Sequence, residues 1–359
     1  MKSNDKKVNI LVVLIRKIRI VMNRLKLLVT VPLFAAVLCS SCNKDDDNFN
    51  LNVYVAGYEN NEEGVPVAKL WINGASHNLT DGAYLSIANS VYVSDNNVYV
   101  AGYEKNEQGL IVAKLWKNGI VQNLTDGTSV AYASSVYVSG GDVYVVGQEA
   151  EAGKRYVAKL WKNGIVQNLT DGTSDAYTYS VYVSGSDVYV VGFESNGMDK
   201  SFAKLWKNGI PQNLTDGTNW ADANSVCTSG SNVYVGGSEN RVAKLWKDRV
   251  VQNIDGTHSS EIYSVYVSGS DVYATGVELA DKYCAVLWKN SVKQNLSSAS
   301  PWASGYSVYV LDNNAYVAGT GINTGSGTTH VAKLWNNGVL QDLTDGRHDA
   351  AAYSVFVVK

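Results

Sequence analysis

Cysteine and histidine are scarce in this sequence, and several common catalytic motifs are missing. Its 359 residues include four cysteines and four histidines. The histidines have no metal-ligand spacing, and no Gly-x-Ser-x-Gly elbow, P-loop or dinucleotide fingerprint is present. The chain beyond residue 50 also lacks sustained helical periodicity. These absences argue against a disulfide scaffold, against the enzyme classes that use these motifs and against a helical fold.

The apolar run at the N-terminus is too short to cross a membrane. The basic stretch 22–26 precedes an apolar run of twelve residues, 27–38, and small residues then lead to a cysteine. We interpret residues 1–41 as a secretory signal peptide. Met22 is the simplest true initiator, and a long segment upstream of the apolar run is the alternative.

The end of this segment resembles a bacterial lipoprotein signal, in which a cysteine after small residues is acylated. Cys42 would be that residue, although Cys39 stands where such signals usually carry leucine. The acidic stretch 43–47 resembles the export tag of surface lipoproteins of Bacteroidota. The resemblance implies an outer-membrane protein, anchored by lipid alone and exposed at the cell surface. A solvated tether over residues 42–50 would explain the same charges without a sorting role.

Charge and cysteine usage limit the possible partners. Without residues 1–41 the formal charge is −10, so we do not expect a nucleic-acid partner. Cys227 and Cys284 each replace an apolar residue of the repeat described below, and we predict two buried thiols. A disulfide between them is the alternative. We expect the protein to be a monomer.

One repeated unit dominates the remaining sequence. The stretch Ala-Lys-Leu-Trp-Lys-Asn-Gly at 113–119 recurs with small changes, and its tryptophans are spaced 40 to 47 residues apart. They are Trp71, Trp116, Trp161, Trp206, Trp246, Trp288 and Trp335. A period of this size indicates a repeat architecture of seven units.

Each unit divides into four short runs rich in β-branched and aromatic residues, separated by turn formers. In one copy the runs are 135–138, 143–147, 156–161 and 165–169. Four strands in seven copies predict an all-β fold, a seven-bladed β-propeller over residues 51–359 with four antiparallel strands per blade.

The two ends of this region complement each other. It begins with a second strand at 51–57 and ends with a first strand at 354–358, so we predict that the C-terminal strand completes the first blade. The layout resembles kelch-like propellers, in which an innermost strand is followed by one that ends in glycine. The glycine doublet of that family is present only at Gly236–Gly237, so no family function is carried over.

The repeated residues are expected to be structural. We predict that the seven tryptophans pack between neighbouring blades, with a ring of ligand-stacking tryptophans as the alternative. A repeated glutamate after the second strand is expected to pair with the lysine before Leu-Trp, and the aspartate of Thr-Asp-Gly to form turns. We expect no cofactor, although a structural cation bound by these acids is possible.

Function is expected at the end of the propeller where the loops vary. The fourth-to-first and second-to-third connections share this end and differ between copies, whereas the two hairpins at the other end recur nearly unchanged. Trp220 and Trp302 lie outside the regular tryptophan spacing. The candidate ligand-binding residues are Trp220, Trp302, Tyr132, Tyr177, His258, His348, Asp175, Asp222, Glu261 and Asp349.

Aromatic side chains beside carboxylates suit a surface that stacks on sugar rings and hydrogen-bonds hydroxyls. We therefore predict a binding module for a glycan or a protein ligand. The tyrosines of these loops could instead fill the central channel. A pure protein scaffold is one alternative function, and a glycosidase or polysaccharide lyase using the same surface is another. The many repeated acids do not single out the two carboxylates that a glycosidase needs.

Overall fold

The computed structural model describes residues 51–150, 155–197, 200–252, 254, 259–280, 282–297, 302–323 and 327–359. The predicted signal peptide, Cys42 and tether lie outside the described residues. Every helix or strand element within these ranges is a strand. None of the described segments forms a helix with the length and apolar character needed to cross a bilayer.

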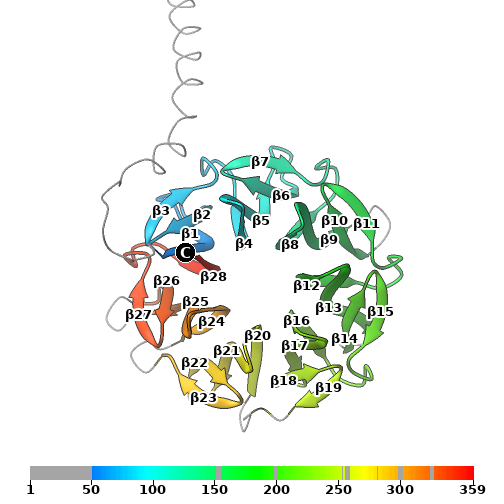
Figure 1. Ribbon diagram of the computed structural model, residues 1–359. Coiled ribbons are helices and arrows are strands. Elements are labelled where there is room, and N and C mark those ends of the chain that lie inside the picture. The colour runs from blue at the N-terminus through cyan, green and yellow to red at the C-terminus, as the bar shows by residue number, and fades with distance from the viewer. Residues whose placement is uncertain are drawn as a thin grey trace, which may run out of the picture. The chain divides into compact units, whose positions relative to one another are not determined.

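Seven four-stranded antiparallel sheets form the blades of a ring (Figure 1). The innermost strands are β28 (Ala350–Val358), β4 (Ser86–Ser94), β8 (Ala131–Ser139), β12 (Ala176–Ser184), β16 (Ala221–Ser229), β20 (Ser259–Ser268) and β24 (Ser304–Leu311). The second strands are β1 (Asn52–Asn60), β5 (Asn97–Lys105), β9 (Asp142–Ala150), β13 (Asp187–Gly197), β17 (Asn232–Glu239), β21 (Asp271–Leu279) and β25 (Asn314–Ile322). The third strands are β2 (Pro66–Ile72), β6 (Ile111–Lys117), β10 (Tyr156–Lys162), β14 (Lys200–Lys207), β18 (Val242–Lys247), β22 (Tyr283–Lys289) and β26 (His330–Asn336). The outermost strands are β3 (Ala75–Asn78), β7 (Ile120–Asn123), β11 (Ile165–Asn168), β15 (Ile210–Asn213), β19 (Val250–Gln252), β23 (Val292–Asn295) and β27 (Val339–Asp342).

The predicted seven-bladed propeller is confirmed, and so is its closure. Blade 1 has the strand order β28-β1-β2-β3, and blades 2 to 7 follow in chain order. In blade 1, Asn52 pairs with Val358 and Val55 with Val355, so the last strand joins the sheet that the first strand begins. This pairing closes the ring, because the first and last strands of the domain share one sheet.

The Lys-Asn-Gly hairpins form because asparagine and glycine tolerate positive φ. At Asn163 and Gly164, for example, φ is +51° and +80°, as a two-residue type I′ turn requires. The Asn163 side chain also accepts a hydrogen bond from the Val143 backbone N–H at 2.8 Å. These turns, together with the hairpins between first and second strands, form the constant end of the propeller. The opposite end, with the other two connections, is the variable end.

The seven repeated tryptophans lie in the core, as predicted. Each is at most 1 % exposed. Trp206 of blade 4 packs in one cluster with Tyr144, Val146 and Ala158 of blade 3, which shows that the indole fills the space between two blades. A ligand-stacking role for this ring of tryptophans is therefore wrong, because no ligand can reach them.

The repeated glutamates pair with the repeated lysines. In two blades one member of the pair is replaced by a residue from another position. In blade 2, for example, the Lys114 and Glu104 side chains lie 3.1 Å apart. Blade 6 has Val286 in place of the lysine, and there Lys293 of the outermost strand binds Glu278 at 2.9 Å. Blade 7 lacks the glutamate. Its lysine, Lys333, is 2.7 Å from Asp342.

The aspartates of Thr-Asp-Gly form turns, as predicted. The Asp171 carboxylate accepts hydrogen bonds from the Thr173 backbone N–H at 2.9 Å and from its hydroxyl at 2.7 Å. The same backbone contact recurs at Asp81, Asp126, Asp216 and Asp345. Local turn chemistry therefore accounts for this repeated acid.

A bulge in each innermost strand allows seven serines to link neighbouring blades. The register shifts by one residue next to the serine, and the N–H of the following valine donates to the serine hydroxyl of the preceding blade. A glycine lies opposite because a Cβ at Gly192 would meet the Tyr177 carbonyl oxygen at 1.8 Å. The donors and acceptors are Val91–Ser354, Val136–Ser90, Val181–Ser135, Val226–Ser180, Val265–Ser225, Val308–Ser264 and Val355–Ser307, at 3.0 to 3.4 Å.

Ser225→Ala is expected to destabilise the domain by about 1–2 kcal/mol, because it leaves the buried Val265 N–H without its serine acceptor. Urea unfolding would measure this loss. Ser184→Ala, at the hairpin end of an innermost strand, is the matched control and should change stability by less than about 0.5 kcal/mol. Equal effects of the two changes would contradict a role for the serine ring.

The two cysteines of the domain are free. Cys227 is buried as predicted, and burial raises its pKa to about 12. Cys284 is only partly buried, so the prediction of a second buried thiol is wrong. It lies near the start of β22 at the variable end, where the strand emerges from the blade core.

Candidate functional site

The two tryptophans outside the repeat lie at equivalent positions of blades 5 and 7. Trp220 directly precedes β16, and Trp302 lies two residues before β24. Both belong to the variable end and are nearly half exposed, at 46 % and 45 %. Trp302 also has a φ of +56°, a left-handed conformation that costs a bulky residue about 1–2 kcal/mol. Blade 6 lies between them.

Two cavities open beside these tryptophans and share the side chains of blade 6. A cavity of about 720 Å³ is lined by blades 5 and 6, including Trp220, Asp222, Arg241 and Glu261. A cavity of about 500 Å³ is lined by blades 6, 7 and 1, including Tyr58, Trp302, Tyr306 and Tyr353. Both are lined by Tyr263, Val277 and Tyr283. We call the pair of cavities the double cleft.

The Trp220 ring is fixed by a carboxyl group of β16, the strand that follows it. Its Nε1–H donates to Asp222 at 3.1 Å, and the other Asp222 oxygen accepts from the Ser238 hydroxyl at 2.9 Å. On its far side the indole lies 5.2 Å from the Phe193 ring. Trp302 is held similarly against Tyr283, with ring centroids 5.6 Å apart. Both tryptophans therefore present aromatic surface in a defined orientation.

Asp222 and Glu261 are the two acids at a repeat position that no other blade fills with a charged residue. The same position is Tyr132 in blade 3 and Tyr177 in blade 4. Glu261 accepts a hydrogen bond from the Asn224 amide at 2.9 Å. Burial raises the pKa of Asp222, and burial together with the nearby Asp222 charge raises the pKa of Glu261.

Because the pKa values of Asp222 and Glu261 are raised, replacing both acids by amides should change the stability of the domain in a pH-dependent way. Ionisation of Asp222 and Glu261 opposes folding, so their contribution is most favourable below the unfolded pKa of about 4 and is lost as pH rises through the folded values. Asp222→Asn/Glu261→Gln should therefore become more stable relative to the unmodified protein as pH rises from 3 to 7. Urea unfolding midpoints across this range would measure the trend. A stability difference independent of pH would contradict it.

Tyr132 and Tyr177 belong to an aromatic arc that ends at Trp220. Neighbouring ring centroids along the arc lie 4.8 to 6.4 Å apart. Its members are Tyr103, Tyr132, Tyr156, Tyr177, Phe193 and Trp220. The structure therefore places these two tyrosines beside the double cleft rather than in its lining.

The rings that meet around the propeller axis are a different set, in the middle of the innermost strands. They are Tyr92, Tyr137, Tyr182, Tyr266, Tyr309 and Phe356, and Cys227 occupies the equivalent position in blade 5. Adjacent centroids that are in contact lie 4.7 to 4.9 Å apart. The rings around the axis are therefore mid-strand residues. The suggestion that loop tyrosines fill the channel is wrong for Tyr132 and Tyr177, whose rings contact second and third strands.

The remaining candidates have other surroundings. Asp175 accepts the Tyr156 N–H at 2.9 Å, and Asp349 accepts the His330 N–H at 2.8 Å, so both carboxylates hold the start of a third strand. His348 is half-buried and is not among the residues that line the double cleft. His258 lies outside the described residues.

Five residues that line the double cleft were not predicted from the sequence, namely Arg241, Tyr263, Tyr283, Tyr306 and Tyr353. Three of these tyrosines occupy the bulge position of their innermost strands, where blades 2 and 3 carry Asn89 and Ser134. Aligning the copies residue by residue at the bulge would have revealed them.

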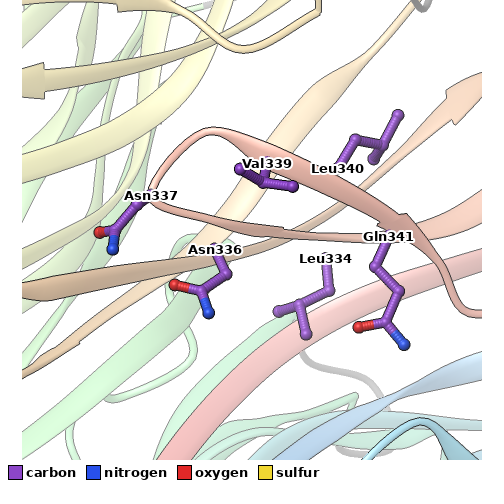
Figure 2. Close-up of a pocket in the computed structure, with 6 residues that line it drawn as sticks. All are labelled: Leu334, Asn336, Asn337, Val339, Leu340 and Gln341. Atoms are coloured by element: carbon purple, nitrogen blue, oxygen red, sulfur yellow. The ribbon is translucent and has the colours of Figure 1, made fainter.

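A separate hollow of about 430 Å³ lies at the constant end, on the hairpin of β26 and β27 (Figure 2). Figure 2 shows its lining as aliphatic and amide side chains, namely Leu334, Asn336, Asn337, Val339, Leu340 and Gln341. It contains no ionisable group and no aromatic ring, so it offers little specificity for a small polar ligand.

Across the described ranges, no cluster of three or more His, Cys, Asp or Glu side chains could hold a metal ion. The predicted possibility of a structural cation therefore has no candidate ligands there. The turn and ion-pair roles of the repeated acids explain their regular spacing without one.

No known family model matches this chain, and no curated protein sequence matches it. Solved structures do match its fold. One is described as the crystal structure of puromycin hydrolase, with a TM-score of 0.57 and 8 % identity over 83 % of this chain. The match covers 52 % of that chain, about half of its length. At this identity the likeness shows the fold alone, and it supports assignment to the β-propellers.

Proposed function

We propose that this protein is a binding module whose double cleft takes a glycan. The observation that carries the proposal is the pair of half-exposed tryptophans, held at equivalent positions on either side of blade 6. Fixed indole rings give large contact area at low entropic cost, and the neighbouring tyrosines, Arg241 and carboxyl groups supply hydrogen-bonding partners for hydroxyls.

The lipoprotein-like motif at the N-terminus supports a cellular location for this function. A lipid anchor at Cys42, followed by a charged tether, would hold the propeller at the outer membrane and expose the domain at the cell surface. A protein ligand at the same cleft, and a scaffold role without a glycan, remain the alternatives that the binding test must separate.

A glycosidase or polysaccharide lyase is a second candidate, favoured by one observation. Asp222 and Glu261 are non-repeated acids that line one cavity, and both have raised pKa values. Carboxyl groups with perturbed pKa values in a cleft are typical of general acid and base catalysts. This candidate predicts new reducing ends or unsaturated products when polysaccharides are incubated with the protein.

Glycan-array binding tests the main proposal. The unmodified protein should bind, and Trp220→Ala/Trp302→Ala should lose at least tenfold in affinity, since about 1.4 kcal/mol suffices for this change. Tyr84→Ala, an exposed tyrosine at the same end in blade 2, is the matched control and should bind normally. Equal binding by the double variant would overturn the cleft assignment. Absence of any glycan binding, with a protein cross-linked at intact cells, would favour the scaffold.

A further inference from the structure

A ring of exposed aliphatic side chains marks the constant end of the propeller. In six blades the first residue after the third-to-fourth hairpin is isoleucine or valine, and each is 64 to 77 % exposed. These residues are Ile120, Ile165, Ile210, Val250, Val292 and Val339. Single exposed apolar residues are ordinary. Here the same exposure recurs at one repeat position around the ring.

These six residues occupy the same position in their repeats, so their side chains lie at the same height along the propeller axis. The outermost strands β7, β11, β15, β19, β23 and β27 surround the ring (Figure 1), and each begins at the constant end with one of these residues. The six side chains therefore lie near one plane. A flat ring of separated apolar groups matches an extended apolar surface better than it matches a groove-filling peptide.

Lysines stand beside the aliphatic residues and complete an interfacial pattern. Lys162 pairs across the hairpin with Ile165, and its ammonium lies 5.2 Å from the centre of the Tyr144 ring. The same lysine–tyrosine contact recurs in blades 2, 4, 5 and 6. These tyrosines are buried, so the surface itself presents the aliphatic side chains and the lysines. Aliphatic side chains beside long cationic ones are typical of surfaces at the boundary between hydrocarbon and lipid headgroups.

The chain enters the propeller at this same end. Asn52, the first residue of β1, accepts a hydrogen bond from the Asn73 side chain of a constant-end hairpin at 3.0 Å. A tether of residues 42–50 reaches at most about 30 Å when fully extended. A lipid on Cys42 would therefore keep the constant end close to the bilayer, while the double cleft opens at the opposite end.

We propose that the constant end of the propeller rests on a lipid bilayer and inserts its ring of aliphatic side chains at the headgroup boundary. This inference rests on the proposed lipid anchor. It does not depend on what the double cleft binds. The adjacent lysines at 162, 207 and 289 are paired with aspartates, so apolar insertion rather than charge drives the contact. Binding is expected to be equal on neutral phosphatidylcholine vesicles and on vesicles containing phosphatidylglycerol.

Hydrogen–deuterium exchange on the full, lipidated chain tests the inference. The protein is compared in detergent and in phosphatidylcholine vesicles. Peptides covering the constant-end hairpins, such as 117–121 and 289–293, should exchange several-fold more slowly in vesicles. Peptides covering the double cleft should be unchanged. A variant with all six aliphatic residues replaced by serine should remain folded and lose this protection.

A matched control replaces Val121, Val166 and Val251 by serine. These residues are the next on three of the same strands, point to the other side of the sheet and are about half exposed. The control should keep the protection. Protein that stays on vesicles with unprotected hairpins would overturn the inference and leave the anchor standing. Protein that fails to stay on vesicles would overturn the anchor and the inference together.

Discussion

Trp206→Ala is expected to destabilise the propeller by about 3–5 kcal/mol. The indole is fully buried between blades 3 and 4, and the neighbouring sheets cannot close the space it leaves, because each is held in its own four-stranded ladder. Urea unfolding followed by circular dichroism would measure the loss as a lower midpoint with an unchanged slope.

Two substitutions control this result. Trp220→Ala removes the same side chain from the surface and should cost less than about 1 kcal/mol. Trp206→Phe should cost far less than Trp206→Ala, because within the described part of the chain the Trp206 N–H has no hydrogen-bond acceptor. Similar losses for Trp206→Ala and Trp220→Ala would contradict the division between core and surface tryptophans.

Asp342→Ala is expected to destabilise the domain by about 2–3 kcal/mol. Lys333 is fully buried, and the substitution removes the carboxylate that lies 2.7 Å from its ammonium. Breaking a buried ion pair is costly because the remaining charge stays out of water. The Asn323 amide oxygen still accepts from Lys333, and Asp342 is itself partly exposed, which places the loss below that of a fully enclosed pair.

The double variant Asp342→Ala/Lys333→Met separates charge from packing. Removing both charges should recover stability to within about 1 kcal/mol of the unmodified protein, since methionine can occupy much of the space of the lysine stem. If the double variant were as unstable as Asp342→Ala alone, the loss would come from packing at β27 and not from an unpaired ammonium.

The double cleft could be predicted from the sequence only in part. Trp220 and Trp302 were identifiable because they break the tryptophan spacing. Asp222 and Glu261 were predicted to lie in the variable loops, and the structure places them at the start of the innermost strands β16 and β20. Tyr283 was not identifiable, because tyrosine is common throughout the repeats and only the structure shows which rings face the cleft. Asp175 and Asp349 look similar in sequence to Asp222, yet the structure uses their carboxylates to hold third strands.

The sequence by itself determined the blade number, the four strands of each blade and the closure of the ring. Those features depend on local alternation, on turn residues and on the spacing of one large buried side chain, all of which are written along the chain. Only the tertiary structure decided that blades 5, 6, 7 and 1 share the double cleft. It also decided that Lys293 and Asp342 replace missing charge partners. Such contacts depend on which side chains of different strands and blades meet, and spacing along one chain does not encode those distances.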